Sequence, residues 1–105
     1  MNDKQKQILH IAQEECAEVI QAISKSMRFG NNAMYHGITN QERLEEEVGD
    51  LLCMVNLMIT RGMIREQETL RFSKLKEDKL RTWSSIFERI YSDSRVLSGW
   101  KIGCR

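Results

Sequence analysis

Residues 14–30, EECAEVIQAISKSMRFG, and residues 39–52, TNQERLEEEVGDLL, decide the fold expected for this chain of 105 residues. Both stretches carry apolar residues at helical spacing, neither contains proline, and each holds a pair of acidic residues three positions apart. Residues at that spacing lie on one face of a helix. Two such helices packed together would therefore bring four carboxylates to one place: Glu15, Glu18, Glu47 and Asp50.

Such a carboxylate cluster predicts a bound divalent metal. Carboxylates that are crowded together and partly removed from water cannot all stay ionised without cations. A di-iron bundle would need Glu-x-x-His pairs, and neither His10 nor His36 follows a glutamate at that spacing. Ligands that are all oxygens favour Mg²⁺, with Mn²⁺ as a substitute. Glu14 is a further carboxylate beside the first pair, either in the solvated face or as a general base.

The composition predicts an all-α fold of one domain. Helix-forming residues dominate and the chain lacks proline. We expect an antiparallel bundle of three to four helices per chain, with a domain at residues 1–91 and a tail at residues 92–105. A chain of this length has a small core, so we expect oligomerisation to complete the bundle.

The boundaries of the helices can be predicted from their capping residues. The first helix should span residues 4–28, with Asn2 or Asp3 as its N-cap and Gly30 just beyond its end. The second should span residues 40–61, with Thr39 and Glu42 forming a capping box. A third helix should start near Arg65, and the helical pattern continues through residues 83–91, as the same helix or a separate one.

The first helix has a broad apolar stripe, and Glu15 falls inside it. We expect Cys16 of this stripe and Cys53 of the second helix to be reduced core residues. With three cysteines and no C-x-x-C pair, neither a disulfide framework nor structural zinc is expected. The stripe consists of Ile8, Ile11, Ala12, Cys16, Val19, Ile20, Ile23 and Met27.

The charge of the chain is divided between its two halves. Residues 1–50 carry a net charge of −4 and residues 51–105 carry +5. This division suits a site that binds metal on one side and phosphate on the other, although charged helix faces are often only solvated surface. The candidate phosphate-binding residues are Lys76 and Lys79 of the third helix, with Lys25 and Arg28. Trp83 or Tyr35 could stack on a base.

These residues resemble the signature of the MazG-type nucleotide pyrophosphohydrolases, which is E-E-x-x-E, a spacer, and then E-x-x-D. In this chain the match is formed by Glu14, Glu15 and Glu18, followed after 28 residues by Glu47 and Asp50. The resemblance covers about residues 5–84. It implies a helical enzyme that hydrolyses a nucleoside triphosphate between the α and β phosphorus, using a metal-activated water. The signature acids would be the metal ligands, and the enzyme would be a homodimer or homotetramer.

The resemblance also favours a class of substrate. A short single domain resembles phage members, and one phage branch removes dGTP and dATP, so a purine deoxynucleotide is the favoured substrate. Two alternatives remain open. A non-catalytic helical assembly protein could bind structural cations with the same acids. A nucleic-acid-binding protein would usually be clearly basic, and the clustered acids would repel the phosphate backbone.

The sequence gives no sign of export or membrane insertion. No signal peptide precedes the first helix, and no apolar run approaches the length that spans a membrane. We therefore expect a cytoplasmic protein that binds neither membranes nor nucleic acid.

Overall fold

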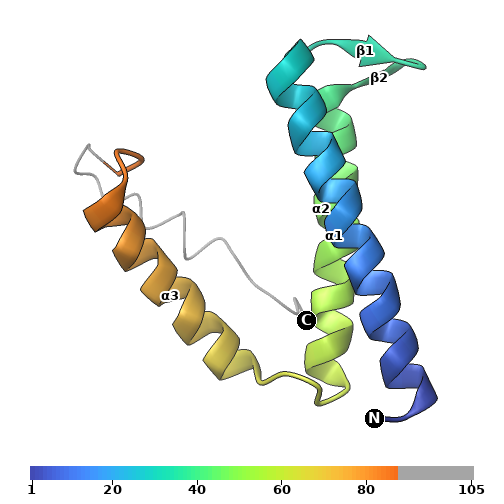
Figure 1. Ribbon diagram of the computed structural model, residues 1–105, viewed down its shortest axis with the longest axis vertical. Coiled ribbons are helices and arrows are strands. Elements are labelled where there is room, and N and C mark those ends of the chain that lie inside the picture. Colours follow the sequence, from blue (N-terminus) through green and yellow to red (C-terminus); the bar gives the residue numbers. More distant parts are fainter. Residues whose placement is uncertain (88–105) are drawn as a thin grey trace.

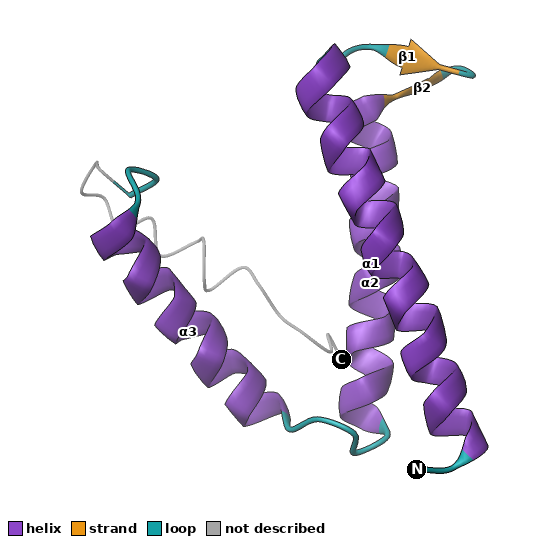
Figure 2. Cartoon of the chain, in the orientation of Figure 1, coloured by secondary structure: helices purple, strands orange, loops and turns teal. Residues whose placement is uncertain are grey.

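A computed structural model describes residues 1–87 of the chain, and this part is almost entirely helical. It contains the helices α1 (Asp3–Phe29), α2 (Asn40–Thr60) and α3 (Glu66–Trp83). Two short strands, β1 (Met34–Tyr35) and β2 (Ile38–Thr39), form a hairpin between the first two helices (Figures 1 and 2). The predicted all-α fold is confirmed. The predicted boundary between domain and tail lies outside the described residues.

Helices α1 and α2 run antiparallel and pack against each other along most of their length (Figure 1). Helix α1 begins with a capping box in which the Asn2 side chain accepts from the Gln5 amide at 2.8 Å and the Gln5 side chain accepts from the Asn2 amide. The helix is followed by its C-cap residue Gly30, whose φ of +88° is accessible to glycine without steric cost. These boundaries match those expected from the sequence.

The start of α2 also matches the prediction. The Glu42 carboxylate accepts from both the backbone amide and the hydroxyl of Thr39, each at 3.0 Å, and the Thr39 hydroxyl accepts from the Glu42 amide. This capping box fixes where α2 begins. The register of α2 in turn determines the face on which its acidic residues lie.

The β-hairpin was not predicted, because its residues read as a polar loop. Met34 pairs with Thr39 and Tyr35 with Ile38, and both turn residues, His36 and Gly37, have positive φ. Positive φ at two successive residues is the geometry of a tight hairpin turn.

The hairpin is tied to the helices by the buried Asn40. The side-chain nitrogen of Asn40, Nδ2, donates to the backbone carbonyl of Gly30 at 2.9 Å and to that of Lys25 at 3.4 Å. A buried amide with partners on a neighbouring helix is costly to remove. Asn40 therefore holds the end of α1 against the start of α2.

Helix α3 leaves the α1–α2 pair instead of packing along it (Figure 1). The segment after α2 turns at Gly62, which has a φ of +71°, and directs α3 away from the pair. Helix α3 ends at Trp83, and the described residues beyond it, 84–87, do not continue the helix. The predicted continuation through residue 87 is therefore wrong, and its remainder lies outside the described residues.

The core between α1 and α2 is small. Among the described residues, the buried apolar side chains are Ala12, Ala22 and Met54. Only part of the apolar stripe of α1 is buried, because the one neighbouring helix, α2, covers only part of it. Cys16 and Cys53 are also exposed, contrary to the expectation that both lie in the core. Large side chains left exposed on α1 are Leu9, Ile11, Ile20, Ile23, Met27 and Phe29.

The cap of α2 makes stability depend on pH. Hydrogen bonds from Thr39 lower the pKa of Glu42 below its ordinary value of 4.5. The bond from the Thr39 backbone amide has the larger effect and the bond from its hydroxyl the smaller one. A carboxyl with a lowered pKa in the folded state stabilises the fold above its unfolded pKa, and this contribution is lost as pH falls through the folded pKa. We predict that Glu42→Ala lowers the melting temperature at neutral pH. The difference from wild type should shrink below pH 4.5.

Circular dichroism melts from neutral to acidic pH would measure this difference. The exposed Glu45, on the same helix, provides the matched variant Glu45→Ala, which should melt like wild type throughout. A deficit for Glu42→Ala that stays constant with pH would contradict the electrostatic origin of the cap.

Candidate active site

The acidic residues of α1 and α2 meet where the two helices pack. Carboxylate oxygens of Glu15, Glu47 and Asp50 lie within 4.8 Å of one another. Glu18 lies close enough to Glu47 for a hydrogen bond between the two side chains. The spacing of three residues on each helix thus produces the convergence expected from the sequence. We call these four residues the carboxylate cluster.

The carboxylate cluster is electrostatically strained. Partial desolvation, followed by the negative charges of Asp50, Glu18 and Glu14, raises the pKa of Glu15. Partial desolvation, followed by the charge of Glu18 and by the hydrogen bond that protonated Glu47 donates to the Glu18 carboxylate, raises the pKa of Glu47. Glu15 and Glu47 are both half-buried, whereas Asp50 is exposed. A positive charge placed among them would relieve both the repulsion and the loss of hydration.

A divalent cation fits this environment. The ligands that the cluster offers are carboxylate oxygens, which suit hard ions such as Mg²⁺ and Mn²⁺. Three of them converge from two helices, and one of the three residues, Asp50, is exposed to solvent. A Glu-Glu-Asp group able to hold a metal is therefore present in the described chain.

A pocket of about 220 Å³ adjoins the carboxylate cluster. Glu18 and Glu47 form its acidic end, and Lys25 and Arg43 place two cationic side chains around it. Carboxylates beside cationic groups are suited to a ligand that brings both a metal and phosphates. The remaining residues that line the pocket are Gln21, Ala22, Tyr35, Ile38 and Asn40.

A second, more apolar pocket lies under the hairpin. It is lined by Lys25, Tyr35 and Asn40, which also line the first pocket, together with Phe29, Ala33 and Met34. The Lys25 ammonium lies 5.9 Å from the centre of the Tyr35 ring. The two pockets therefore form a continuous surface that runs from carboxylates, past cations, to aromatic and apolar side chains.

Two residues of this surface were missed at the sequence level. Arg43 precedes Glu47 by four positions and Gln21 follows Glu18 by three, so each lies on the face of its helix that carries the acids. That spacing could have identified them. Arg43 also pairs with Glu46 at 2.9 Å, which places the Arg43 side chain on the flank of α2.

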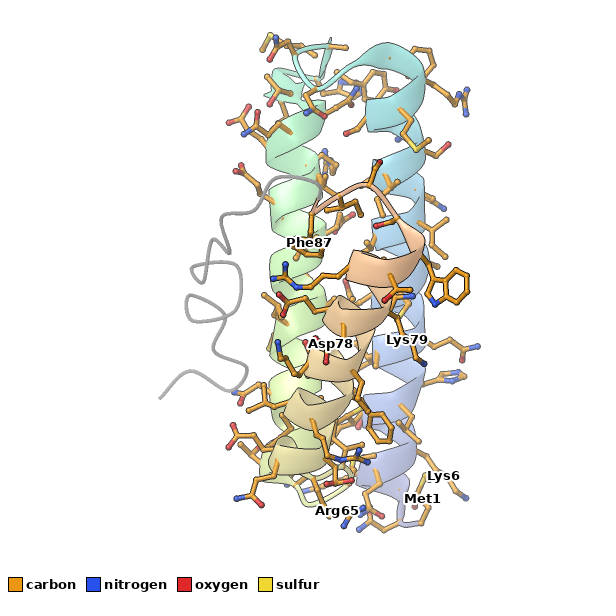
Figure 3. All side chains as sticks on the ribbon, turned by 90° about the vertical axis from the view of Figure 1, so that its left-hand side faces the viewer. Met1, Lys6, Arg65, Asp78, Lys79 and Phe87 are labelled. Carbon is orange, nitrogen blue, oxygen red and sulfur yellow. The ribbon has the colours of Figure 1, made fainter. Side chains whose placement is uncertain are left out.

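Other predicted site residues lie away from the carboxylate cluster within one chain. Lys76, Lys79 and Trp83 are exposed on α3, which diverges from α1 and α2 (Figure 1). Figure 3, viewed from the side of α3, shows Lys79 projecting from the flank of that helix. Arg28 lies over the Phe29 ring at 4.9 Å and does not line the pocket beside the carboxylates.

Glu14 occupies an intermediate position. It is exposed, and its charge contributes to raising the pKa of Glu15. It is therefore near the carboxylate cluster without being one of the three carboxylates that converge most closely.

Comparison with known proteins agrees with the geometry of the site. The family model for the MazG nucleotide pyrophosphohydrolase domain matches residues 3–75. The chain belongs to this family. The matched residues contain the whole carboxylate cluster and both pockets beside it. No curated protein and no solved structure matched the chain.

Family membership confirms part of what the sequence predicted. MazG domains are nucleotide pyrophosphohydrolases, so that general activity and a nucleotide ligand are supported for this chain. The all-α bundle and the short MazG-like domain are likewise confirmed. None of the helices in the described part of the chain is both long and apolar enough to cross a membrane.

The strain in the carboxylate cluster predicts a stabilising substitution. The pKa of Glu47 is raised in the folded state, so its ionised form costs stability at pH values above that pKa, and the cost disappears as pH falls. We predict that Glu47→Gln raises the melting temperature of the MazG domain at neutral pH in EDTA. Adding Mg²⁺ should raise the melting temperature of wild type more than that of Glu47→Gln.

Thermal melts with EDTA and with Mg²⁺ would measure both effects, with Glu45→Gln as the control for loss of a charge on α2. If Glu47→Gln melts below wild type in EDTA, repulsion among the carboxylates is not the dominant force at this site.

Proposed function

We propose that this MazG domain hydrolyses nucleoside triphosphates, with Mg²⁺ or Mn²⁺, to a monophosphate and pyrophosphate. The observation that carries the proposal is the position of the carboxylate cluster at one end of a pocket that also contains Lys25 and Arg43. A triphosphate with its cation has charges that complement both ends of this surface. The expected role is to clean or shape the nucleotide pool.

In this proposal the carboxylate cluster holds the cation. Glu15, Glu47 and Asp50 supply the converging oxygens, and Glu18 completes the set from the edge of α1. A bound divalent metal polarises phosphate oxygens and makes water easier to deprotonate. Glu14, exposed beside the cluster, is the residue we propose as acceptor of the proton lost by the attacking water.

The chemistry requires no co-reactant other than water. The water oxygen forms a bond to the α or the β phosphorus. The bond from that same phosphorus to the α–β bridging oxygen then breaks. Pyrophosphate and the monophosphate leave as separate anions. Lys25 and Arg43 lie where they would offset the negative charge that develops on the phosphate oxygens.

The apolar pocket under the hairpin is the proposed place for the nucleobase. The Tyr35 ring offers a stacking surface, and Phe29 and Met34 provide apolar contact. A purine has the larger stacking area, which agrees with the resemblance to phage members that act on dGTP. We accordingly propose a purine deoxynucleotide as the preferred substrate.

Residues of α3 could complete the site from a second chain. Lys76, Lys79 and Trp83 project from a helix that does not pack on its own α1–α2 pair. In a homodimer or homotetramer, α3 of one subunit could bring these side chains to the phosphates bound by another. We propose an oligomer of this kind, with residues 1–91 as the domain and residues 92–105 as a separate tail.

Release of pyrophosphate tests the proposal. The eight common NTPs and dNTPs would be assayed with Mg²⁺, Mn²⁺ and EDTA. We predict metal-dependent turnover, fastest with a purine deoxynucleotide, and a fall of at least about 100-fold in Asp50→Ala because a metal ligand is lost. Arg43→Gln should lower kcat and kcat/KM to a similar extent, because Arg43 is proposed to offset charge that develops on the phosphate oxygens in the transition state.

Glu45→Ala serves as the control, since Glu45 is exposed on α2 and does not belong to the carboxylate cluster. Helix content of each variant would be checked by circular dichroism. Full turnover in Asp50→Ala would overturn the assignment of the site. Folded, metal-binding wild type that releases no pyrophosphate from any of the eight nucleotides would favour an assembly protein with structural cations.

A further inference from the structure

Asn40 is a buried polar residue that the chemistry proposed above does not use. It is the first residue of α2, directly after β2, and it is 8% exposed. It lines both the pocket beside the carboxylate cluster and the apolar pocket under the hairpin. A few precisely placed polar groups in a pocket of this kind orient a ligand and provide specificity.

The orientation of the Asn40 amide is fixed by its own hydrogen bonds. Nδ2 donates to two backbone carbonyls, that of Gly30 at 2.9 Å and that of Lys25 at 3.4 Å. An amide turned the other way would place Oδ1 against both carbonyls, and carbonyls cannot donate. The two carbonyls also use both hydrogens of Nδ2. The acceptor Oδ1 is therefore what the side chain has left to offer.

Oδ1 of Asn40 has no hydrogen-bond partner within residues 1–87. It is not sealed from solvent either. In the described part of the chain, the enclosed side-chain oxygens without a partner belong to Ser26 and Glu77. Oδ1 thus stays open, and a ligand would reach it through the pockets that Asn40 lines.

The chemistry of Oδ1 limits what can bind to it. An amide oxygen accepts hydrogen bonds and donates none, so its partner must carry an O–H or an N–H. Ionised phosphate oxygens are acceptors and cannot pair with it. The cations that suit phosphates are Lys25 and Arg43 in the pocket beside the carboxylate cluster. Oδ1 of Asn40 is therefore suited to the nucleoside part of a nucleotide.

The position of Asn40 indicates which part of the nucleoside it meets. The phosphates are proposed to lie in one pocket and the base in the other, and the sugar joins them. The residues that line both pockets are Lys25, Tyr35 and Asn40. Lys25 offers only donors, whereas Oδ1 of Asn40 is only an acceptor. In a deoxynucleotide the free hydroxyl of the sugar is the one at the 3′ position.

We propose that Asn40 is a specificity-determining residue whose Oδ1 accepts a hydrogen bond from the sugar 3′-hydroxyl of the bound nucleotide. This proposal rests on the proposed function, from which it takes the places of the phosphates and the base. The carbonyls of Gly30 and Lys25 hold the amide in position before the ligand arrives, so little order is lost on binding. A ligand without the hydroxyl leaves Oδ1 unpaired, and the site rejects it for that reason.

Equilibrium binding tests the proposal without requiring turnover. The full chain would be titrated in Mg²⁺, by isothermal calorimetry, with the non-hydrolysable α,β-imido analogues of dGTP and of 2′,3′-dideoxy-GTP. Wild type should bind the dideoxy analogue at least about ten-fold more weakly. Asn40→Ala should bind the two analogues with similar affinity, because the acceptor for the hydroxyl is gone.

Thr39→Val is the matched control. Thr39 is the neighbour of Asn40, and its hydroxyl caps α2 by accepting from the Glu42 amide. Its loss should lower the melting temperature but leave the preference for the hydroxyl unchanged, because Oδ1 of Asn40 remains. If Asn40 were only structural, Asn40→Ala would weaken both analogues equally and keep the preference.

The comparison of analogues in wild type still decides the question if Asn40→Ala fails to fold. Equal affinity of wild type for the two analogues, or no binding of either, would overturn the proposal. So would a preference that persists in folded Asn40→Ala.

A third analogue separates the sugar from the base. The α,β-imido form of dITP lacks the 2-amino group of guanine and keeps the 3′-hydroxyl. If its affinity falls while that of the dideoxy analogue does not, Oδ1 meets the base and the sugar assignment is wrong. A wild type that shows the preference for the hydroxyl but releases no pyrophosphate would support this proposal and overturn the proposed function.

Discussion

Repulsion among carboxylates at the α1–α2 contact is the constraint on which the rest of this structure depends. Glu15 and Glu47 are held half-buried where two helices pack, and their neighbours are Glu18 and Asp50. Apolar residues packed at this contact would give a more stable helix pair than half-buried carboxylates do. The chain instead keeps acids whose pKa values are raised, and such groups gather at functional sites more often than elsewhere. A cation resolves the repulsion and gives the arrangement a chemical use.

The same contact explains why so little of the chain is buried. Carboxylates occupy part of the interface that apolar residues would otherwise fill, and small residues such as Ala12 and Ala22 supply the close packing. Helix α3 adds little packing to the pair. Capping at Thr39 and the buried amide of Asn40 then fix the register of the helices and the position of the hairpin. These local interactions position Lys25, Tyr35 and Arg43 around one pocket.

Features set by local rules could be predicted from the sequence. The caps at Asn2 and Thr39, the end of α1 at Gly30 and the convergence of two acid pairs all follow from spacing and side-chain chemistry. Features set by long-range packing could not. Nothing in the apolar stripe of α1 says which part α2 covers, so Cys16 was expected in the core and is exposed. The direction of α3 depends on the turn near Gly62, and the hairpin depends on the positive φ of His36. The hydrophobic pattern of the sequence reveals neither feature.

Binding of Mn²⁺, followed by the loss of the electron paramagnetic resonance signal of the free ion, would show whether the carboxylate cluster is a metal site. We predict that wild type and Glu45→Gln bind Mn²⁺ equally well. Glu47→Gln should bind at least about ten-fold more weakly, because it removes one converging oxygen charge. Equal Mn²⁺ binding by all three folded proteins, or none by wild type, would contradict the claim that this carboxylate cluster is a metal site.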